Sequence, residues 1–212
     1  MIESRNGGPQ KIDTEFRLLC DRVLFLGAEV EQALDRATLA FANHDREMAD
    51  SVLYHDDAID QIEISIDRQC ARVLELSHPS NPQLRLVLCM VKIAPLLERI
   101  ADRACEIARI VIAVKEQPYP IVSEIRAMSS HALSMLRTAL HAVISNDPIA
   151  ARRVVESADK MTQLYNHTLY GLFAMIVSRP TLAAFHKKQL LVAQHLARIA
   201  SYVTDMCALT TL

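Results

Sequence analysis

The fold is decided by Leu97-Glu98-Arg99-Ile100-Ala101, which returns near the other end of the chain as Leu196-Ala197-Arg198-Ile199-Ala200, an offset of 99 residues. A second pair of stretches, Arg36 to Asp45 and Arg137 to Asn146, matches at an offset of 101 residues. These stretches lie in long segments whose apolar residues recur every three or four positions, which is typical of amphipathic helices. The sequence therefore predicts a duplicated helical unit of about a hundred residues.

Prolines and short polar breaks divide the 212 residues into six long segments with helical periodicity. The predicted helices span residues 13–43, 46–76, 83–115, 121–145, 148–178 and 182–210. Short connections between long helices make each neighbour antiparallel to the last. We therefore predict an all-α fold of two tandem three-helix bundles, the first over residues 12–116 and the second over residues 121–212.

Composition excludes several classes of protein. The chain has only 4 Gly, too few for the tight turns of an all-β fold or for the phosphate-cradling loops of nucleotide-binding domains. Its 23 Lys and Arg and 25 Asp and Glu form no basic tail or stripe, which argues against nucleic-acid binding.

The cysteines and the N-terminal sequence indicate a cytoplasmic protein. The 5 Cys include no CxxC pair, so we expect buried, reduced thiols in a reducing compartment. Residues 1–11 are polar and lack the apolar core of a signal peptide. No segment approaches the roughly 20 uninterrupted apolar residues that a membrane span needs.

Charge is distributed unevenly between the two halves. Residues 1–116 carry 14 Lys and Arg against 20 Asp and Glu, a net charge of −6, whereas residues 117–212 carry 9 against 5, a net charge of +4. A bound cation is one reason why a fold would tolerate the acidic excess of the first half.

Two acidic pairs stand out within that half. Asp56 and Asp60 are four residues apart on the second predicted helix, and Glu98 and Asp102 are four apart on the third. This spacing puts both members of a pair on one helical face, where like charges repel. If the two antiparallel helices face each other, four to six carboxylate oxygens surround one volume, with Glu63 and Glu106 as further candidates. Such oxygens suit magnesium, manganese or iron, or zinc with open positions.

Three interpretations of these acids stay open. Acidic residues on helices are usually solvated, and Arg99 or Arg103 could pair with them, which would leave a helical adaptor without metal. With a metal, the protein is either a binding module or a metal-dependent enzyme that uses the same carboxylates. An enzyme would be expected to have histidine near its metal, and the nearby His55 lies about 100° round the helix from Asp56.

A weaker signal precedes the third predicted helix. Asn81-Pro82-Gln83-Leu84-Arg85 is typical of a loop followed by a helix start. Arg85 is therefore a candidate for a surface contact, or an ordinary solvated residue of the first helical turn.

At these residues the sequence resembles the PhoU family of phosphate-signalling proteins. The resemblance covers nearly the whole chain, including the duplication, and is carried by Val30-Glu31-Gln32, Asp56 to Asp67, Pro82 to Leu86 and Lys92 to Ile107. It implies an all-α fold of two three-helix bundles. The family's E(D)xxxD motifs, two per bundle, hold iron, zinc or other cations, and in the first bundle they fall on Asp56, Asp60, Glu98 and Asp102.

The resemblance also implies a function. Members of the family are regulators, not enzymes, and commonly form homodimers. They restrain phosphate uptake and the phosphate-starvation response through the ATPase subunit of the phosphate transporter and a membrane sensor histidine kinase. On this basis we expect a cytoplasmic negative regulator that reaches the membrane only indirectly, through its partners.

The second bundle departs from the family pattern. Ala197 and Ser201 stand where the acids of the third helix should recur. The fifth predicted helix retains Asp159, but Thr162 and Tyr165 replace the acids that the first half keeps at Asp60 and Glu63. Neutral side chains of this kind do not replace carboxylates as ligands, so we predict one metal site, in the first bundle.

Overall fold

The computed structural model describes residues 9–76, 80–114 and 123–209, and its regular structure there is helical, without strands. It contains α1 (Pro9–Asn43), α2 (Arg46–Leu76), α3 (Asn81–Ala113), α4 (Ser123–Ile144), α5 (Pro148–Ser178), a short 3₁₀ helix (Pro180–Leu182) and α6 (Ala183–Ala208). The all-α prediction is confirmed, and each predicted boundary lies within four residues of an observed one. The segment Pro118 to Pro120, predicted as the junction between the two bundles, lies outside the described residues.

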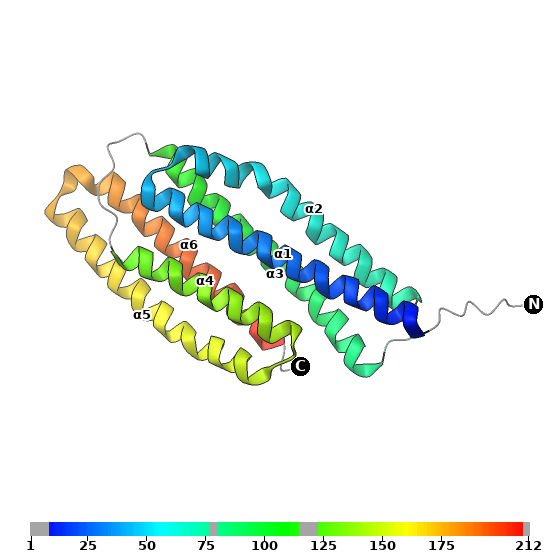
Figure 1. Ribbon diagram of the computed structural model, residues 1–212. Coiled ribbons are helices and arrows are strands. Elements are labelled where there is room, and N and C mark those ends of the chain that lie inside the picture. Colours follow the sequence, from blue (N-terminus) through cyan, green and yellow to red (C-terminus); the bar gives the residue numbers. More distant parts are fainter. Residues whose placement is uncertain (1–8, 77–79, 115–122, 210–212) are drawn as a thin grey trace, which may run out of the picture.

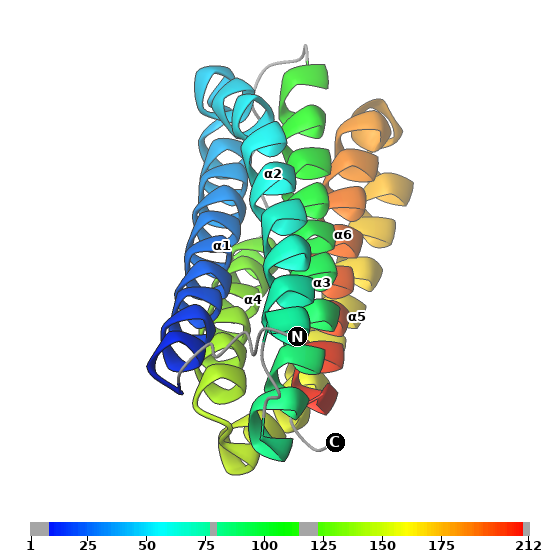
Figure 2. The same ribbon diagram turned by 90° about the vertical axis from the view of Figure 1, so that its right-hand side faces the viewer.

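The six helices form two three-helix groups that lie side by side (Figures 1 and 2). Helices α1, α2 and α3 pack against one another, as do α4, α5 and α6. Between the groups, α1 contacts α4 and α3 contacts α6, so α2 and α5 lie on opposite outer sides. In the described part of the chain, none of these helices is long and apolar enough to cross a membrane.

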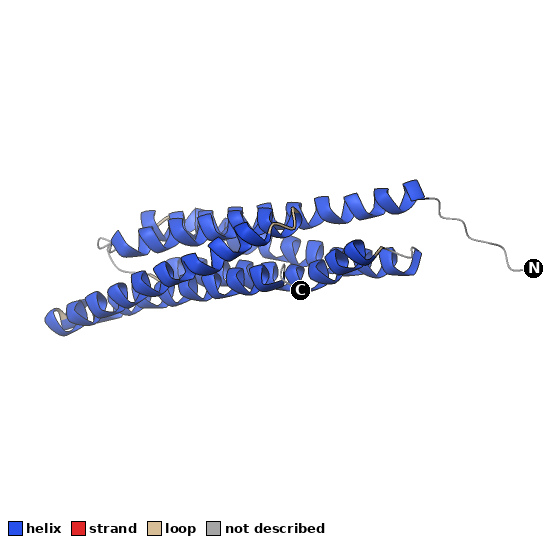
Figure 3. Cartoon of the chain, turned by 90° about the horizontal axis from the view of Figure 1, so that it is seen from below, coloured by secondary structure: helices blue, strands red, loops and turns tan. Residues whose placement is uncertain are grey.

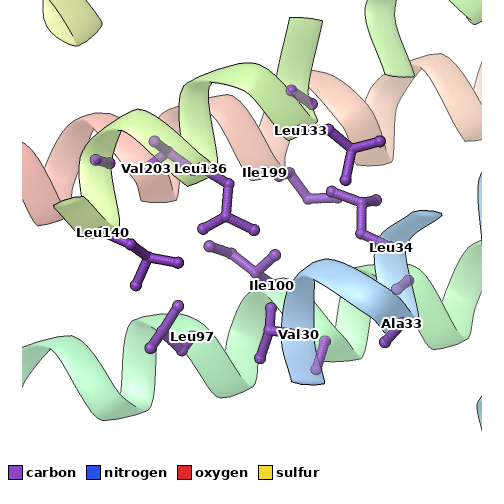
Figure 4. Close-up of a cluster of buried hydrophobic side chains, with 14 of the residues drawn as sticks. Val30, Ala33, Leu34, Leu97, Ile100, Leu133, Leu136, Leu140, Ile199 and Val203 are labelled. Atoms are coloured by element: carbon purple, nitrogen blue, oxygen red, sulfur yellow. The ribbon is translucent and has the colours of Figure 1, made fainter. Parts of the chain in front are cut away.

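A single hydrophobic core joins the two bundles. Leu34 of α1, Ile100 of α3, Leu136 of α4 and Ile199 of α6 are fully buried and point toward one another between the bundles (Figure 4). They belong to apolar stripes with helical spacing, of the kind that turns one face of each helix toward a core. Removal of this apolar surface from water holds the two halves together as one body.

The turns α1–α2 and α4–α5 show the duplication in atomic detail. The N–H of Asp45 donates to the carbonyl of Ala40 at 2.9 Å, and the N–H of Asp147 donates to that of Ala142 at 2.8 Å. The preceding residues, His44 and Asn146, both have a positive φ, 56° and 50°. The structural offset here is therefore 102 residues, one more than the sequence match of 101 indicated. Asp147, not Asn146, is the counterpart of Asp45.

Cations from two other helices cap the C-terminal end of α3. The Arg46 guanidinium donates to the carbonyls of Ile112 and Val114, at 3.1 and 2.7 Å. The Lys188 ammonium donates to the carbonyl of Ala113 at 3.0 Å. The last carbonyls of a helix have no partner within the helix and carry partial negative charge, which these side chains satisfy. Since Lys188 belongs to α6, this cap also ties the bundles together.

At Gly27, the α1 backbone lies close to the side chain of Leu140 on α4. A Cβ atom built on Gly27 would lie 2.7 Å from both terminal methyl carbons of Leu140, closer than real side-chain atoms approach. The other helical glycine, Gly171 on α5, has no neighbouring atom within 4 Å of such a Cβ. The two glycines therefore differ in what a larger side chain would meet.

We predict that Gly27→Val lowers the free energy of unfolding by about 1–3 kcal/mol, because its side chain forces α1 away from α4. Gly171→Ala should raise it by about 0.5–1 kcal/mol, because alanine favours a helix interior. Urea unfolding followed by circular dichroism measures both. Leu140→Ala in the Gly27→Val background should recover part of the loss, and a fully stable Gly27→Val variant would contradict the close approach.

Candidate functional site

The acidic pairs lie on the seam between α2 and α3. These antiparallel neighbours pack closely, and Asp56, Asp60, Glu98 and Asp102 are all partly buried there. Helical geometry explains which acids of α2 take part. Ile59 and Ile66 enter the core, which places Asp56 and Asp60 at its edge and leaves Asp57 exposed.

The carboxylates of the two helices act on one another across the seam. Burial raises the pKa of Asp60, and the negative charges of Asp56, Asp102 and Asp57 raise it further. Burial likewise raises the pKa of Glu98, with additional contributions from Asp102, Asp60 and Glu63. Asp60 of α2 therefore lies near enough to Glu98 of α3 for its charge to raise the pKa of Glu98.

Glu63 extends this acidic group along α2. Burial makes the largest contribution to the raised pKa of Glu63, and the negative charges of Asp67 and Asp60 raise this pKa further. Glu63 in turn raises the pKa of Glu98 on the neighbouring helix. We call Asp56, Asp60, Glu63, Glu98 and Asp102 the acidic seam.

The arginines of α3 do not neutralise the acidic seam. Arg99 lowers the pKa of Glu98, but burial and the nearby carboxylates outweigh it, so the net shift is upward. The Nη2 atom of Arg103 lies 3.8 Å from Oδ2 of Asp102, a loose ion pair. Burial and the neighbouring carboxylates therefore outweigh these arginines, and the pKa values of Asp60 and Glu98 stay raised.

Sequence reasoning missed Cys105, which was expected to be only a buried thiol. Its side chain is 1% exposed. Burial strongly raises the pKa of this thiol, and a hydrogen bond to Asp56 and the charge of Asp56 raise it further. The sequence does place Cys105 three residues after Asp102 on the same helical face. It does not reveal that Asp56 of α2 lies opposite.

The donor chemistry of the acidic seam fits a hard or borderline cation, because partly buried carboxylate oxygens are the ligands that such ions prefer. The side chains of the acidic seam, however, are not oriented for holding an ion. Among residues 9–76, 80–114 and 123–209, no three His, Cys, Asp or Glu side chains are arranged to hold a metal ion. Cation binding here would require rotation of the carboxylates about their side-chain bonds.

Glu106 and Arg85 lie apart from this arrangement. The Arg109 guanidinium donates to the Glu106 carboxylate at 2.7 Å, which gives this acid a cation of its own. Arg85 is exposed and lies 13 residues before Glu98, about 20 Å along α3. Together with Phe16, Asn146 and Leu209, it lines a cavity of about 580 Å³ where α1, α3, the α4–α5 turn and α6 meet.

The second bundle has the same backbone arrangement but no acidic seam. At the structural offset of 102 residues, buried Met161 and Thr168 of α5 match buried Ile59 and Ile66 of α2. The counterparts of Asp56, Asp60 and Glu63 are then Ala158, Thr162 and Tyr165. Between α3 and α6 the offset is 99 residues, because buried Leu196 and Ile199 match buried Leu97 and Ile100, so Glu98 and Asp102 correspond to Ala197 and Ser201. The retained acid, Asp159, corresponds to the exposed Asp57 and not to a seam position.

Comparisons with known proteins agree with this duplicated architecture. The family model described as the PhoU domain matches twice, over residues 23–111 and 125–210. A protein of Aquifex aeolicus named as a phosphate-specific transport system accessory protein PhoU homolog is 30% identical over 80% of this chain and 77% of its own. The Escherichia coli protein named as a phosphate-specific transport system accessory protein is 26% identical over 93% of this chain and 82% of its own.

Solved structures show the same fold. The crystal structure of PhoU from Pseudomonas aeruginosa superposes with a TM-score of 0.87 at 27% identity, and covers 93% of this chain and 96% of the other. That of the phosphate transport system regulatory protein PhoU from Streptococcus pneumoniae also has a TM-score of 0.87, at 28% identity, and covers 94% and 95%. With both halves matched by the family model, this chain belongs to the PhoU family.

Proposed function

We propose that this protein regulates phosphate uptake and phosphate-starvation signalling as a metal-binding helical adaptor in the cytoplasm. The observation that carries the proposal is the acidic seam, in a chain whose relatives are named for phosphate transport. A fold that keeps mutually repelling, half-buried carboxylates is less stable than it need be, and such strain is typical of functional sites.

The proposed ligands are Asp56, Asp60, Glu98 and Asp102, with Glu63 at the edge of the site. Glu106 is the least suited, because Arg109 already pairs with it. A bound divalent or trivalent cation, such as iron, zinc, manganese or magnesium, would neutralise the acidic seam and hold α2 against α3. Only the first bundle would bind metal, since the counterparts in the second are neutral.

We further propose that the protein acts through binding and not as an enzyme. A metal-dependent hydrolase would need a general base close to the metal. His55 is exposed, and its Nδ1 lies 2.7 Å from the carbonyl oxygen of Ser51 on the same helix. Metal-dependent turnover of phosphate esters that Asp60→Asn abolishes would instead support an enzymatic function.

The proposed partners are the ATPase subunit of a phosphate transporter and a membrane sensor histidine kinase, with the protein acting as a homodimer that restrains both. Relatives named as accessory proteins of a phosphate transport system support this assignment. A metal that stiffens the α2–α3 seam would give such a regulator a rigid surface for docking.

The first prediction from this proposed function concerns the stability of the protein without metal. Because folding raises the pKa of Asp60 and of Glu98, the folded state binds more protons than the unfolded state, and its stability falls as the pH rises through the folded pKa values. Asp60→Asn or Glu98→Gln removes this loss and should raise the free energy of unfolding at pH 7 by about 0.5–1 kcal/mol. Urea unfolding in chelator at several pH values measures the change.

The pH dependence and a matched control make this prediction specific. The gain should disappear near pH 3, below the ordinary pKa values of 3.8 and 4.5, where the carboxylates are protonated in both states. Asp159→Asn changes an exposed acid of the second bundle and should have little effect. A loss of stability at pH 7 in both seam variants would show that the carboxylates do not repel one another.

The second prediction concerns metal binding. Added iron or zinc should raise the melting temperature of the chelated protein, because a ligand of the folded state stabilises it by mass action, by about 2.7 kcal/mol at a hundred times the dissociation constant. Asp102→Ala should abolish the shift and the bound metal found by elemental analysis. Ser201→Ala, at the counterpart position, should leave both intact, and metal retained by Asp102→Ala would contradict a first-bundle site.

The third prediction concerns the transporter. The purified ATPase subunit should capture this protein more strongly when metal is present than in chelator, because metal orders the α2–α3 seam. The ATPase subunit should capture the Asp60→Asn variant equally with metal and with chelator, and as weakly as it captures the unchanged protein in chelator. Capture that does not depend on metal would separate the adaptor function from the acidic seam.

A further inference from the structure

A row of apolar side chains faces outward near the C-terminal end of α5. Tyr170, Phe173 and Val177 are 73%, 49% and 80% exposed. Their spacing of three and four residues places them on one side of the helix, opposite the side on which Thr168 and Leu172 are buried. We call Tyr170, Phe173 and Val177 the α5 row.

The duplication shows that the fold does not require these residues. At the structural offset of 102 residues, the same positions on α2 hold Arg68, Ala71 and Glu75, and all three are exposed. The first bundle thus presents side chains typical of a solvated helix face where the second presents a tyrosine, a phenylalanine and a valine. The packing of a three-helix bundle does not account for the difference.

The stretch of sequence that contains the α5 row has basic residues and no acidic ones. From Lys160 to Thr204 the sequence contains 5 Lys and Arg and no Asp or Glu. Two of these cations, Arg179 and Lys187, are exposed and lie next to the turn between α5 and α6. Glu124 of α4 is close to this hairpin, and it pairs with His167 at 3.3 Å.

The α5–α6 turn projects at one end of the molecule (Figures 1 and 3). Helix α5 packs against α4, α6 and the 3₁₀ helix, on the side away from the α5 row. The cavity lined by Arg85 and Asn146 is at the other end of α5, about 45 Å away. The α5 row is therefore an outward helix face that is separate from this cavity.

From these observations we propose that the α5 row, with Arg179 and Lys187, docks directly on an anionic lipid bilayer. Exposed apolar side chains enter the boundary between headgroups and acyl chains, tyrosine is suited to that boundary, and nearby cations bind acidic headgroups. This contact goes beyond the regulatory function proposed above, which reaches the membrane through partners, and it needs neither metal nor transporter. A symmetric contact between two copies of this surface would bring like charges together.

Sedimentation with lipid vesicles tests the proposal on the full chain. Vesicles of phosphatidylethanolamine and phosphatidylglycerol should bind the protein, and vesicles of phosphatidylcholine should not. Raising the salt concentration should weaken binding, because salt screens the attraction to acidic headgroups. The double variants Phe173→Ser/Val177→Ser and Arg179→Glu/Lys187→Glu should each weaken binding about tenfold or more.

A matched control separates this surface from general hydrophobicity. Leu88 on α3 and Tyr54 on α2 are 49% and 83% exposed. These exposed fractions are similar to those of Phe173 and Val177, 49% and 80%. Leu88→Ser/Tyr54→Ser should bind vesicles like the unchanged protein. Because all of these side chains are exposed, every variant should keep its helical circular dichroism spectrum.

Several results would overturn the proposal. The first is that the unchanged protein does not bind anionic vesicles. The second is that it binds phosphatidylcholine vesicles equally well, and the third is that Leu88→Ser/Tyr54→Ser weakens binding as much as Phe173→Ser/Val177→Ser does. If Phe173→Ser/Val177→Ser binds vesicles normally but no longer self-associates in analytical ultracentrifugation, the surface meets a second copy of the chain. If the variant binds vesicles normally but loses only its capture by the transporter ATPase, the surface meets a protein partner.

Discussion

Burial of one apolar face shared by α1, α3, α4 and α6 is the constraint on which the rest of the structure depends. Leu34, Ile100, Leu136 and Ile199 meet there without solvent contact, and Gly27 allows α1 to approach Leu140 of α4 closely. Because these four helices share the central core, α2 and α5 lie on the outside, and each packs one side against the two other helices of its bundle and leaves its other side facing outward. The features that bear on function lie on those seams and faces.

The duplication lets one half of the molecule serve as a reference for the other. Core positions keep their apolar character in both halves, as Leu97 and Leu196 show. The seams differ, since carboxylates in the first bundle correspond to Ala158, Thr162, Ala197 and Ser201 in the second. The outer faces differ in the opposite sense, with charged residues on α2 and apolar ones on α5. Packing therefore requires apolar residues at the core positions, and it leaves the residues of the seams and of the outer faces free to vary.

The sequence predicted the helices well and the relations between them less well. Periodicity and proline act locally, so the helix ends could be placed within four residues. The turn register was wrong by one residue, because the match aligned Asp45 with Asn146 when the capping hydrogen bond belongs to Asp147. Asp159, the acid that the second half retains, corresponds to the exposed Asp57 and not to a seam position. Cys105 was missed because spacing along α3 says nothing about which residue of α2 lies opposite, and the cavity beside Arg85 joins elements too distant in sequence to foresee.

The acidic seam is best understood as a cost that the fold accepts in one bundle and avoids in the other. Arg99 and Arg103 stand beside these carboxylates, yet the pKa of Glu98 and of Asp60 stays raised. The second bundle shows that the same helices pack with alanine, threonine and serine at the corresponding positions. Folding therefore does not require the acids, and their mutual repulsion works against it. The proposal that the first bundle binds a cation rests on this contrast between the two halves, because partly buried carboxylate oxygens are the ligands that hard cations prefer.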